Sequence, residues 1–275
     1  MEIFALLFIF IVGLFVGSFL NVVIMRWGTG KSFVTGRSVD VGTGKTLPWY
    51  DLVPILSFIC LRGRSRFSGK MLSIQYPVVE LITSLLFAGT YWKLFGTEFP
   101  YSVDIFSISL LFLYLFIISV LVVIAFYDLR TKIIPNSLVY IFIFLSGLVL
   151  FMHYGLELFT RVGFLEILAG PILWFPFAFL WFVSRGAWMG YGDAKLAWGI
   201  GWFLGLLLGI SAVILSFWIG AIISLALIGL KKLLDERLSF LSENFTIKSE
   251  VPFAPFLVAG TLIVFYFNIN VLLLF

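Results

Sequence analysis

The chain has 275 residues, of which 62% are hydrophobic and 12% are charged, and its formal net charge is +4. A soluble domain carries about 25% charged residues, so this composition excludes an ordinary soluble protein and predicts an all-α polytopic membrane protein. The single cysteine, Cys60, excludes an intrachain disulfide and a four-cysteine metal site, and we expect its side chain to be buried as a small hydrophobe.

Charges, prolines and glycine clusters divide the chain into eight predicted membrane spans, because crossing the hydrocarbon takes about 20 apolar residues. The predicted spans are 3–25, 74–92, 104–126, 134–152, 164–183, 194–208, 210–230 and 252–274. The stretch from Leu196 to Leu230 contains no polar loop, and Gly205 and Gly209 are its only candidates for a tight hairpin. The predicted domains are therefore a first transmembrane helix (1–25), a cytoplasmic basic loop domain (26–73) and a seven-helix membrane domain (74–275).

The first span is predicted to be a retained helix rather than a cleaved signal peptide. No basic region precedes it, it is too long for a signal-peptide core, and the first positive charge, Arg26, follows it. With the N-terminus outside, 16 of the 18 lysines and arginines fall on the inner side, and only Lys93 and Arg161 fall outside. Because positively charged loops stay in the cytoplasm, this asymmetry supports the predicted orientation.

Asp128 and Asp193 are predicted to lie at the same depth, at the inner ends of two helices. Asp128 follows the third span in "AFYDLRTKIIPNSLVY", and Asp193 precedes the sixth in "GAWMGYGDAKLAWGIG". An ionisable residue at membrane depth is costly and is by default a candidate for function. Gly190 and Gly192 leave the backbone before Asp193 bare, so that another backbone, such as that of a peptide substrate, can approach closely. The alternative is a glycine turn in which Asp193 is an ordinary helix N-cap.

Two carboxyl groups held close together cannot both ionise cheaply, so this pair should share one proton near neutral pH. One aspartate can then take a proton from a water that attacks a peptide carbonyl, while its partner donates a proton, and no cofactor is needed. A helix dipole favours negative charge at the N-terminus and disfavours it at the C-terminus. We therefore expect Asp193 to be more ionised than Asp128 before substrate binds.

Six ordered motifs run nearly the length of the chain. They are "GLFVGSFLNVVIMR" (13–26), "LPWYDLVPILSFICLRGRSR" (47–66), "SIQYPVVEL" (73–81), "YDLRTKIIPN" (127–136), "GYGDAKL" (190–196) and "VPFAPFLVAG" (251–260). In these motifs the chain resembles the type IV prepilin peptidases, which belong to the GxGD class of intramembrane aspartyl proteases.

The resemblance implies that Asp128 and Asp193 are the catalytic pair and that the substrate is a type IV prepilin or pseudopilin precursor. The implied reaction removes its short basic leader at the cytoplasmic face of a bacterial cytoplasmic (inner) membrane. Many members of the family then methylate the new N-terminus with S-adenosylmethionine, so this second activity is implied too.

One feature of the family is missing. Many members carry two CxxC pairs in the first cytoplasmic loop, the ligand set of a structural zinc site. Aligned through "WYD" and "RGR", these positions are Asp40, Thr43, Ser65 and Ser68. One carboxylate and three hydroxyls suit zinc poorly, so we expect a metal-free loop. Its eight basic residues, against Asp40 and Asp51, favour anionic lipid headgroups as a partner, alongside simple solvation of the charged face. We expect no nucleic-acid partner.

Further residues are candidates to line the site or to bind the substrate. They are Gly190, Gly192, Lys195, Glu80, Asn21, Arg26 and Pro252. Lys195, two residues along a helix from Asp193, should point away from it and suits a headgroup contact better than catalysis. For Glu80, inside the second span, structural pairing and substrate contact are equally open. Pro252 and Pro255 should break or bend the start of the last helix.

Two other classes of function remain open. Membrane carboxylates and glycine-interrupted helices also suit a proton-coupled transporter, which usually has related halves and polar sites near the middle of the membrane. We find no internal repeat, and both aspartates fall at the inner interface. An inactive scaffold subunit of a pilus or secretion assembly is the other alternative, which the missing cysteines keep open and the intact aspartate pair disfavours.

Overall fold

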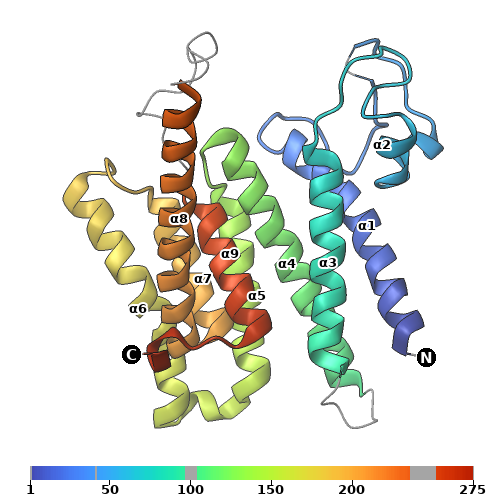
Figure 1. Cartoon of the computed structure of the whole chain (residues 1–275). Helices are drawn as coiled ribbons and strands as arrows, with labels where there is room; N and C mark the ends of the chain where they lie inside the picture. The colour runs from blue at the N-terminus through green and yellow to red at the C-terminus, as the bar shows by residue number, and fades with distance from the viewer. Residues whose placement is uncertain (1, 41, 97–103, 236–251, 275) are drawn as a thin grey trace. The chain divides into compact units, whose positions relative to one another are not determined.

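The computed structural model describes residues 2–40, 42–96, 104–235 and 252–274 (Figure 1). The chain divides into two compact units, Met1–Tyr127 (unit 1) and Asp128–Phe275 (unit 2), and each is described by itself. The loop predicted as a domain at 26–73 lies within unit 1, and its separation from the membrane helices stays a prediction.

Unit 1 is built on two helices that pack along each other, α1 (Glu2–Arg26) and α3 (Gln75–Phe95) (Figure 1). A Cβ atom on Gly13 would lie 2.6 Å from the Cα of Ser84, and one on Gly17 would lie 2.7 Å from the Cα of Glu80. Small residues are therefore required on α1, because they let the two helix backbones approach closely.

The loop between α1 and α3 contains two short helical turns, η1 (Trp49–Leu52) and α2 (Leu56–Cys60). Cys60 is exposed, so the expectation that it is buried is wrong. It ends a five-residue helix in an open loop, where little packs over it.

The helix α4 (Ile105–Thr131) begins in unit 1 and ends in unit 2. Asp104 caps its start, since the N–H of Ser107 donates to Oδ1 of Asp104 at 2.9 Å. Such a cap satisfies one of the free N–H groups of the first turn.

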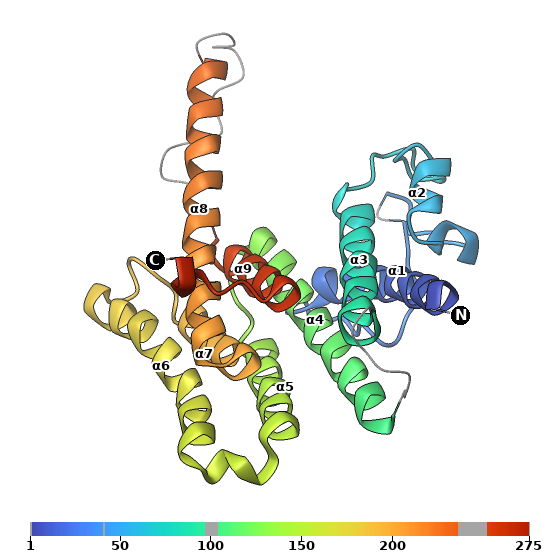
Figure 2. The ribbon, with the colours of Figure 1, turned by 60° about the horizontal axis from the view of Figure 1, so that its bottom comes forward.

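Unit 2 is a helical bundle around a short central helix. Its helices are α5 (Asn136–Tyr154), α6 (Arg161–Ser184), α7 (Tyr191–Leu204), α8 (Leu206–Asp235) and α9 (Ala254–Phe267), with 3₁₀ turns η2 (Gly155–Phe159) and η3 (Val271–Leu274). Figure 2 shows α7 between α5 and α6. Glycines allow this close packing: a Cβ on Gly199 would lie 2.5 Å from the ring of Phe142, and one on Gly201 would lie 2.5 Å from the carbonyl oxygen of Ala169. Because the glycines give these neighbours room, α7 is held on both sides.

Among the described residues, six helices are long and apolar enough to cross a membrane, namely α1, α3, α4, α5, α6 and α8. This confirms the prediction of an all-α polytopic membrane protein. The helices α7 and α9 fall on the sixth and eighth predicted spans, but each has 14 residues, fewer than the roughly 20 of a full crossing. The number of crossings, predicted as eight, therefore stays a prediction.

The break between α7 and α8 lies at Gly205, one of the two predicted hairpin glycines. Its φ of 80° is a left-handed conformation that glycine adopts without strain. Glu166 of α6 accepts a hydrogen bond from the N–H of Leu206 at 3.0 Å and so caps the start of α8. The predicted end of the sixth span at residue 208 is therefore too late, and Gly209 lies inside α8.

The last helix, α9, is shorter than the predicted span 252–274. It ends at Phe267, and Asn268 follows with a φ of 49°. Asn270 then turns the chain, since its side-chain oxygen accepts from the N–H of Leu272 at 3.1 Å.

Candidate active site

Asp193 lies in the first turn of α7, and its side chain is only 6% exposed. The N-cap of the helix is Gly190, so the alternative in which Asp193 itself is the N-cap is wrong. The N–H of Gly190 donates to the Asp193 carboxylate. In a capping box, an acid at the third helical position accepts from the N-cap N–H in the same way. Within the described part of the chain, Oδ1 of Asp193 has no hydrogen-bond partner. A buried carboxylate oxygen without a donor is rare and calls for a functional explanation.

Gly190 and Gly192 have different surroundings. A Cβ on Gly192 would lie 2.8 Å from the Cβ of Ile134, in the segment between α4 and α5. A Cβ on Gly190 would meet only Oδ2 of Asp193, at 3.5 Å, and then the backbone of Gly192. The close approach expected of these glycines therefore occurs at Gly192 and involves the chain's own Ile134. Among the described residues, no other segment of the chain comes within 4 Å of a Cβ on Gly190.

Asp128 lies in the last turn of α4 and is 4% exposed. Its carboxylate accepts a hydrogen bond from the N–H of Ala254, the first residue of α9. Its carbonyl accepts from the N–H of Lys132 at 2.7 Å, and Lys132 has a φ of 56°, so the chain leaves the helix just after the aspartate. Asp128 is thus held between the end of one helix and the start of another.

The start of α9 is fixed by a phenylalanine cluster. Phe253, the N-cap residue, has its ring centroid 4.9 Å from that of Phe217 and 6.4 Å from that of Phe177. Pro252 comes directly before it, and the helix begins at Ala254, so the predicted break at the prolines is confirmed. The cluster therefore positions the Ala254 N–H that binds Asp128.

The two carboxylates lie close enough to repel each other, and both belong to unit 2. Each faces the N-terminus of a helix, Asp193 that of α7 and Asp128 that of α9. The expectation that Asp193 is more ionised considered only one helix end near Asp128, the unfavourable C-terminus of α4. Because α9 adds a favourable helix end there, the dipole argument no longer distinguishes the two aspartates.

Lys195 is directed toward the start of α5. Its Nζ donates to Oδ1 of Asn136 at 2.8 Å and lies 5.1 Å and 4.8 Å from the ring centroids of Tyr140 and Tyr191. A cation over aromatic faces is held in place by the ring quadrupoles. The ammonium group thus points away from Asp193, as helix geometry predicts.

Glu80 and Asn21 have their contacts inside unit 1. Glu80 accepts hydrogen bonds from the N–H of Ile55 at 2.8 Å and from the hydroxyl of Ser18. Ile55 has a φ of 59°, which a β-branched residue adopts only when its surroundings impose it. Asn21 donates to the carbonyl of Tyr76 at 3.1 Å and so bonds α1 to α3. The structural alternative for Glu80 is the one its contacts support.

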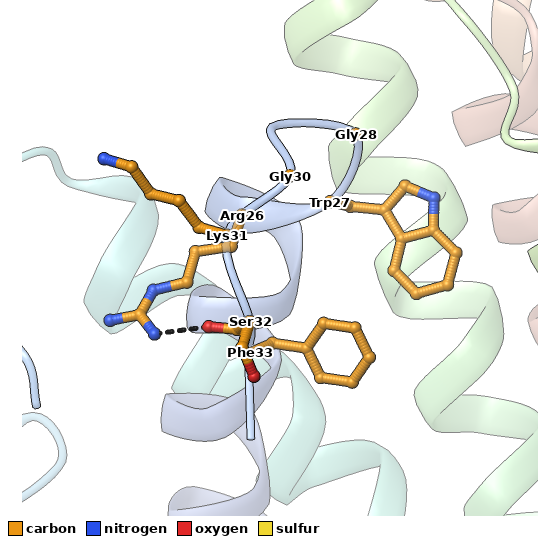
Figure 3. Close-up of a pocket in the computed structure, with 7 residues that line it drawn as sticks. All are labelled: Arg26, Trp27, Gly28, Gly30, Lys31, Ser32 and Phe33. Carbon is orange, nitrogen blue, oxygen red and sulfur yellow. Dashed lines mark hydrogen bonds between the residues drawn. The ribbon is translucent and has the colours of Figure 1, made fainter. Parts of the chain in front are cut away.

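Arg26 holds the segment that follows α1. Its guanidinium donates to the carbonyl oxygens of Ser32 at 2.6 Å and, in two longer bonds, of residues 35 and 37. Figure 3 shows it beside a pocket of about 390 Å³, with Lys31 also at its edge. The rings of Trp27 and Phe33 stack there with centroids 5.7 Å apart. Arg26 is therefore engaged with its own loop.

Sequence reasoning missed the partners that hold the two aspartates, Ala254 and Ile134. No local signal marks either residue, because an alanine and an isoleucine in apolar surroundings look like any other packing residue. The "VPFAPF" motif indicated the helix start, but not what its free N–H groups face.

Comparison with known proteins agrees with this architecture. Residues 11–94 match the bacterial peptidase A24 N-terminal domain, and residues 115–225 match the type IV leader peptidase family. No solved structure matches the chain.

Three relatives, each named prepilin leader peptidase/N-methyltransferase, are similar over most of the chain. The protein of Xanthomonas campestris pv. campestris is 29% identical over 93% of this chain and 89% of its own length, and that of Bacillus subtilis is 29% identical over 96% and 95%. The protein of Pectobacterium carotovorum subsp. carotovorum is 31% identical over 81% of this chain and 83% of its own length. With these relatives and the family models matched in order, the chain belongs to the type IV leader peptidase family.

Proposed function

We propose that the chain is a membrane aspartyl endopeptidase that removes the short basic leader of a type IV prepilin or pseudopilin, with Asp128 and Asp193 as its catalytic residues. The observation that carries the proposal is the meeting of two buried carboxylates from α4 and α7, one of which has an oxygen without a donor. A catalytic water needs such a free acceptor.

The chemistry requires one proton shared between the two aspartates. The ionised aspartate removes a proton from a water molecule, whose oxygen forms a bond to the scissile carbonyl carbon. The protonated aspartate donates to the carbonyl oxygen. Collapse of the tetrahedral intermediate then breaks the C–N bond: the leaving nitrogen takes the proton that the first aspartate removed from water, and the second aspartate regains its proton from the intermediate's hydroxyl. No cofactor enters these steps.

The structure supports one approach for the substrate peptide. Gly190 leaves open space beside Asp193, whereas Gly192 is covered by Ile134. A peptide backbone that reaches the carboxylates would therefore pass Gly190. The ammonium group of Lys195, which lies against the start of α5, would meet an anionic group of the substrate or of a lipid. We place this site at the cytoplasmic face of the bacterial inner membrane, with the N-terminus outside, because of the distribution of basic residues.

N-methylation of the new N-terminus is the second activity that the relatives' names carry. S-adenosylmethionine has a sulfonium, an ammonium and one carboxylate, and is cationic as a whole. The pocket beside Arg26 is lined by two cations and by no carboxylate, and its aromatic rings stack on each other. Its residues do not fit this methyl donor, and we derive no step through it.

The test is mass spectrometry of a pilin-like precursor incubated with the purified protein. We expect Asp128→Asn and Asp193→Asn each to lower the cleavage rate by about 10³-fold or more, because the two residues act as a unit. Glu157→Gln, which changes an exposed carboxylate in η2, should cleave as the parent does. S-adenosylmethionine in the same assay would reveal methylation as a mass gain of one methyl group.

Cleavage that persists in either aspartate variant would refute the proposed pair. If the folded parent leaves several precursors intact, the chain is a scaffold subunit or a transporter instead. Proton flux in vesicles that depends on the same aspartates would then indicate the transporter.

A further inference from the structure

The loop of unit 1 contains two turns of the same construction. The first is closed by the bridge between Val39 and Thr46, and the second by the bridge between Arg64 and Met71. The N–H of Asp40 donates to the carbonyl of Lys45 in the first turn, and the N–H of Ser65 donates to the carbonyl of Lys70 in the second, both at 2.8 Å. In each, a glycine with a φ near 70° donates its N–H back to the start of the turn. The turns end in "TGK" and "SGK", with the second 25 residues after the first.

One carboxylate lies between the two turns and binds both. Oδ1 of Asp40, in the first turn, accepts from the hydroxyls of Ser65 at 2.5 Å and Ser68 at 2.9 Å, both in the second. Oδ2 accepts from the N–H of Thr43 at 2.9 Å and from its hydroxyl at 2.8 Å. Asp40 and Ser65 are buried, at 6% and 7% exposed. Four side chains from two distant stretches thus converge on one point.

The packing between the turns leaves little freedom. A Cβ on Gly42 would lie 2.5 Å from the Cβ of Ser68. The hydroxyl of Ser65 and the other donors hold the pKa of Asp40 at about 2, below its ordinary 3.8. An ionised carboxylate offers only acceptors, so all four donors can bind it, and charge-assisted bonds are the stronger kind.

These four residues occupy the positions where the family's zinc cysteines are expected, so their fit to a metal can be judged. A carboxylate has about four acceptor sites, and all four are filled by donors of the protein itself. The remaining groups are neutral hydroxyls, which are poor ligands for zinc. The donor set does not fit a structural zinc ion.

We propose that the Asp40 carboxylate is a metal-free cross-link that holds the two turns together in the arrangement that a bound zinc ion would otherwise impose. The described apolar side chains of the two turns, Val39, Phe67 and Met71, are exposed and form no core between them, so a central anion with four donors takes the place of both a core and a metal. Asp40 is the required member, because each hydroxyl donates to it.

The first experiment is hydrogen exchange of the two turns in the full-length protein in detergent, with metal analysis of the same sample. We expect substoichiometric zinc and no change in exchange after chelation. Asp40→Asn should speed the exchange of both turns by about tenfold or more, because an amide has one acceptor oxygen in place of two and the charge that binds both turns is lost. Lys70→Gln is the matched control, since it changes an exposed side chain of the second turn and leaves the four donors to Asp40 in place, so it should change exchange less than about threefold.

A second variant tests the geometry independently of Asp40. D40C/T43C/S65C/S68C should bind one zinc ion per chain, and zinc should then slow the exchange of both turns until a chelator removes it. One zinc ion per parent chain, or turns that loosen on chelation, would overturn the proposal. So would an Asp40→Asn protein that exchanges at the parent's rate, or a four-cysteine variant that does not take up zinc.

Discussion

The Gly192→Ala substitution tests how the position of Asp193 depends on the packing of α7. The new Cβ would lie 2.8 Å from the Cβ and 3.1 Å from the Cδ1 of Ile134. Carbon atoms in contact are about 3.5–4.0 Å apart, so the two segments must separate by roughly 1 Å. The Cβ of Ile134 is fixed to its backbone, and no change of rotamer relieves the closer of the two contacts. Overpacking of this kind costs about 1–3 kcal/mol.

The effect on cleavage should exceed the effect on stability. Asp193 follows Gly192 directly, so a shift of the first turn of α7 moves its carboxylate relative to Asp128. A misplacement of about 1 Å in a catalytic group costs about 10²-fold in rate. Gly229→Ala is the control: it lies on the exposed part of α8, and among the described residues nothing lies within 4 Å of an added Cβ there. That variant should retain cleavage within about threefold of the parent.

The assay compares initial rates of leader removal, with thermal unfolding in the same detergent as the measure of folding. We expect Gly192→Ala to lower the initial rate of leader removal by about two orders of magnitude, in a protein that stays folded at the assay temperature. Parent-like cleavage by Gly192→Ala would show that Ile134 does not set the position of α7. An equal loss in both alanine variants would show that the loss does not come from the contact with Ile134.

Three further outcomes follow from single contacts. Glu80→Ala should leave the N–H of Ile55 without its acceptor, destabilise unit 1 by about 1–3 kcal/mol in thermal unfolding, and speed exchange of the Ile55 amide. Glu166→Ala should remove the cap of α8 at Leu206, at a cost of about 1 kcal/mol in the same measurement. The pKa of Asp40 is lowered from 3.8 to about 2, so its stabilisation of the loop is complete above pH 3.8 and is lost as the pH falls through about 2. Hydrogen exchange corrected for intrinsic rates should show this loss in the parent and no such step in Asp40→Asn, since the partners of Asp40 are hydroxyls and an amide that do not titrate there.

The spans and the aspartates could be read from the sequence because each has a local cause. A run of apolar residues long enough to cross the hydrocarbon forms a helix, since lipid offers no partner for its backbone. Gly205 was identified for a similar reason, as a residue whose backbone can turn where the sequence has no polar loop. Asp128 and Asp193 stood out because ionisable residues are costly in such surroundings.

The contacts that position the aspartates cannot be predicted from the residues next to them in the sequence. Nearly every residue of α5 to α9 is apolar, so periodicity does not mark which face of one helix meets another. The approach of Ile134 to Gly192, and of Ala254 to Asp128, depends on how the helices of unit 2 pack together. The expectation that Asp193 is the more ionised aspartate stays a prediction for the same reason, since it counted the helix that carries Asp128 and not α9, which faces it.

Burial alone does not separate the catalytic candidates from the structural acids of this chain. Acids of both kinds accept a backbone N–H that the start of a helix or a turn leaves free, as expected where water is scarce. The acids with such a partner are Asp40, Glu80, Asp104, Asp128, Glu166 and Asp193. Two properties set Asp128 and Asp193 apart: their charges repel each other, and one buried oxygen of Asp193 has no donor among the described residues. A structural acid gains nothing from either property, whereas a pair that must share a proton and bind a water needs both.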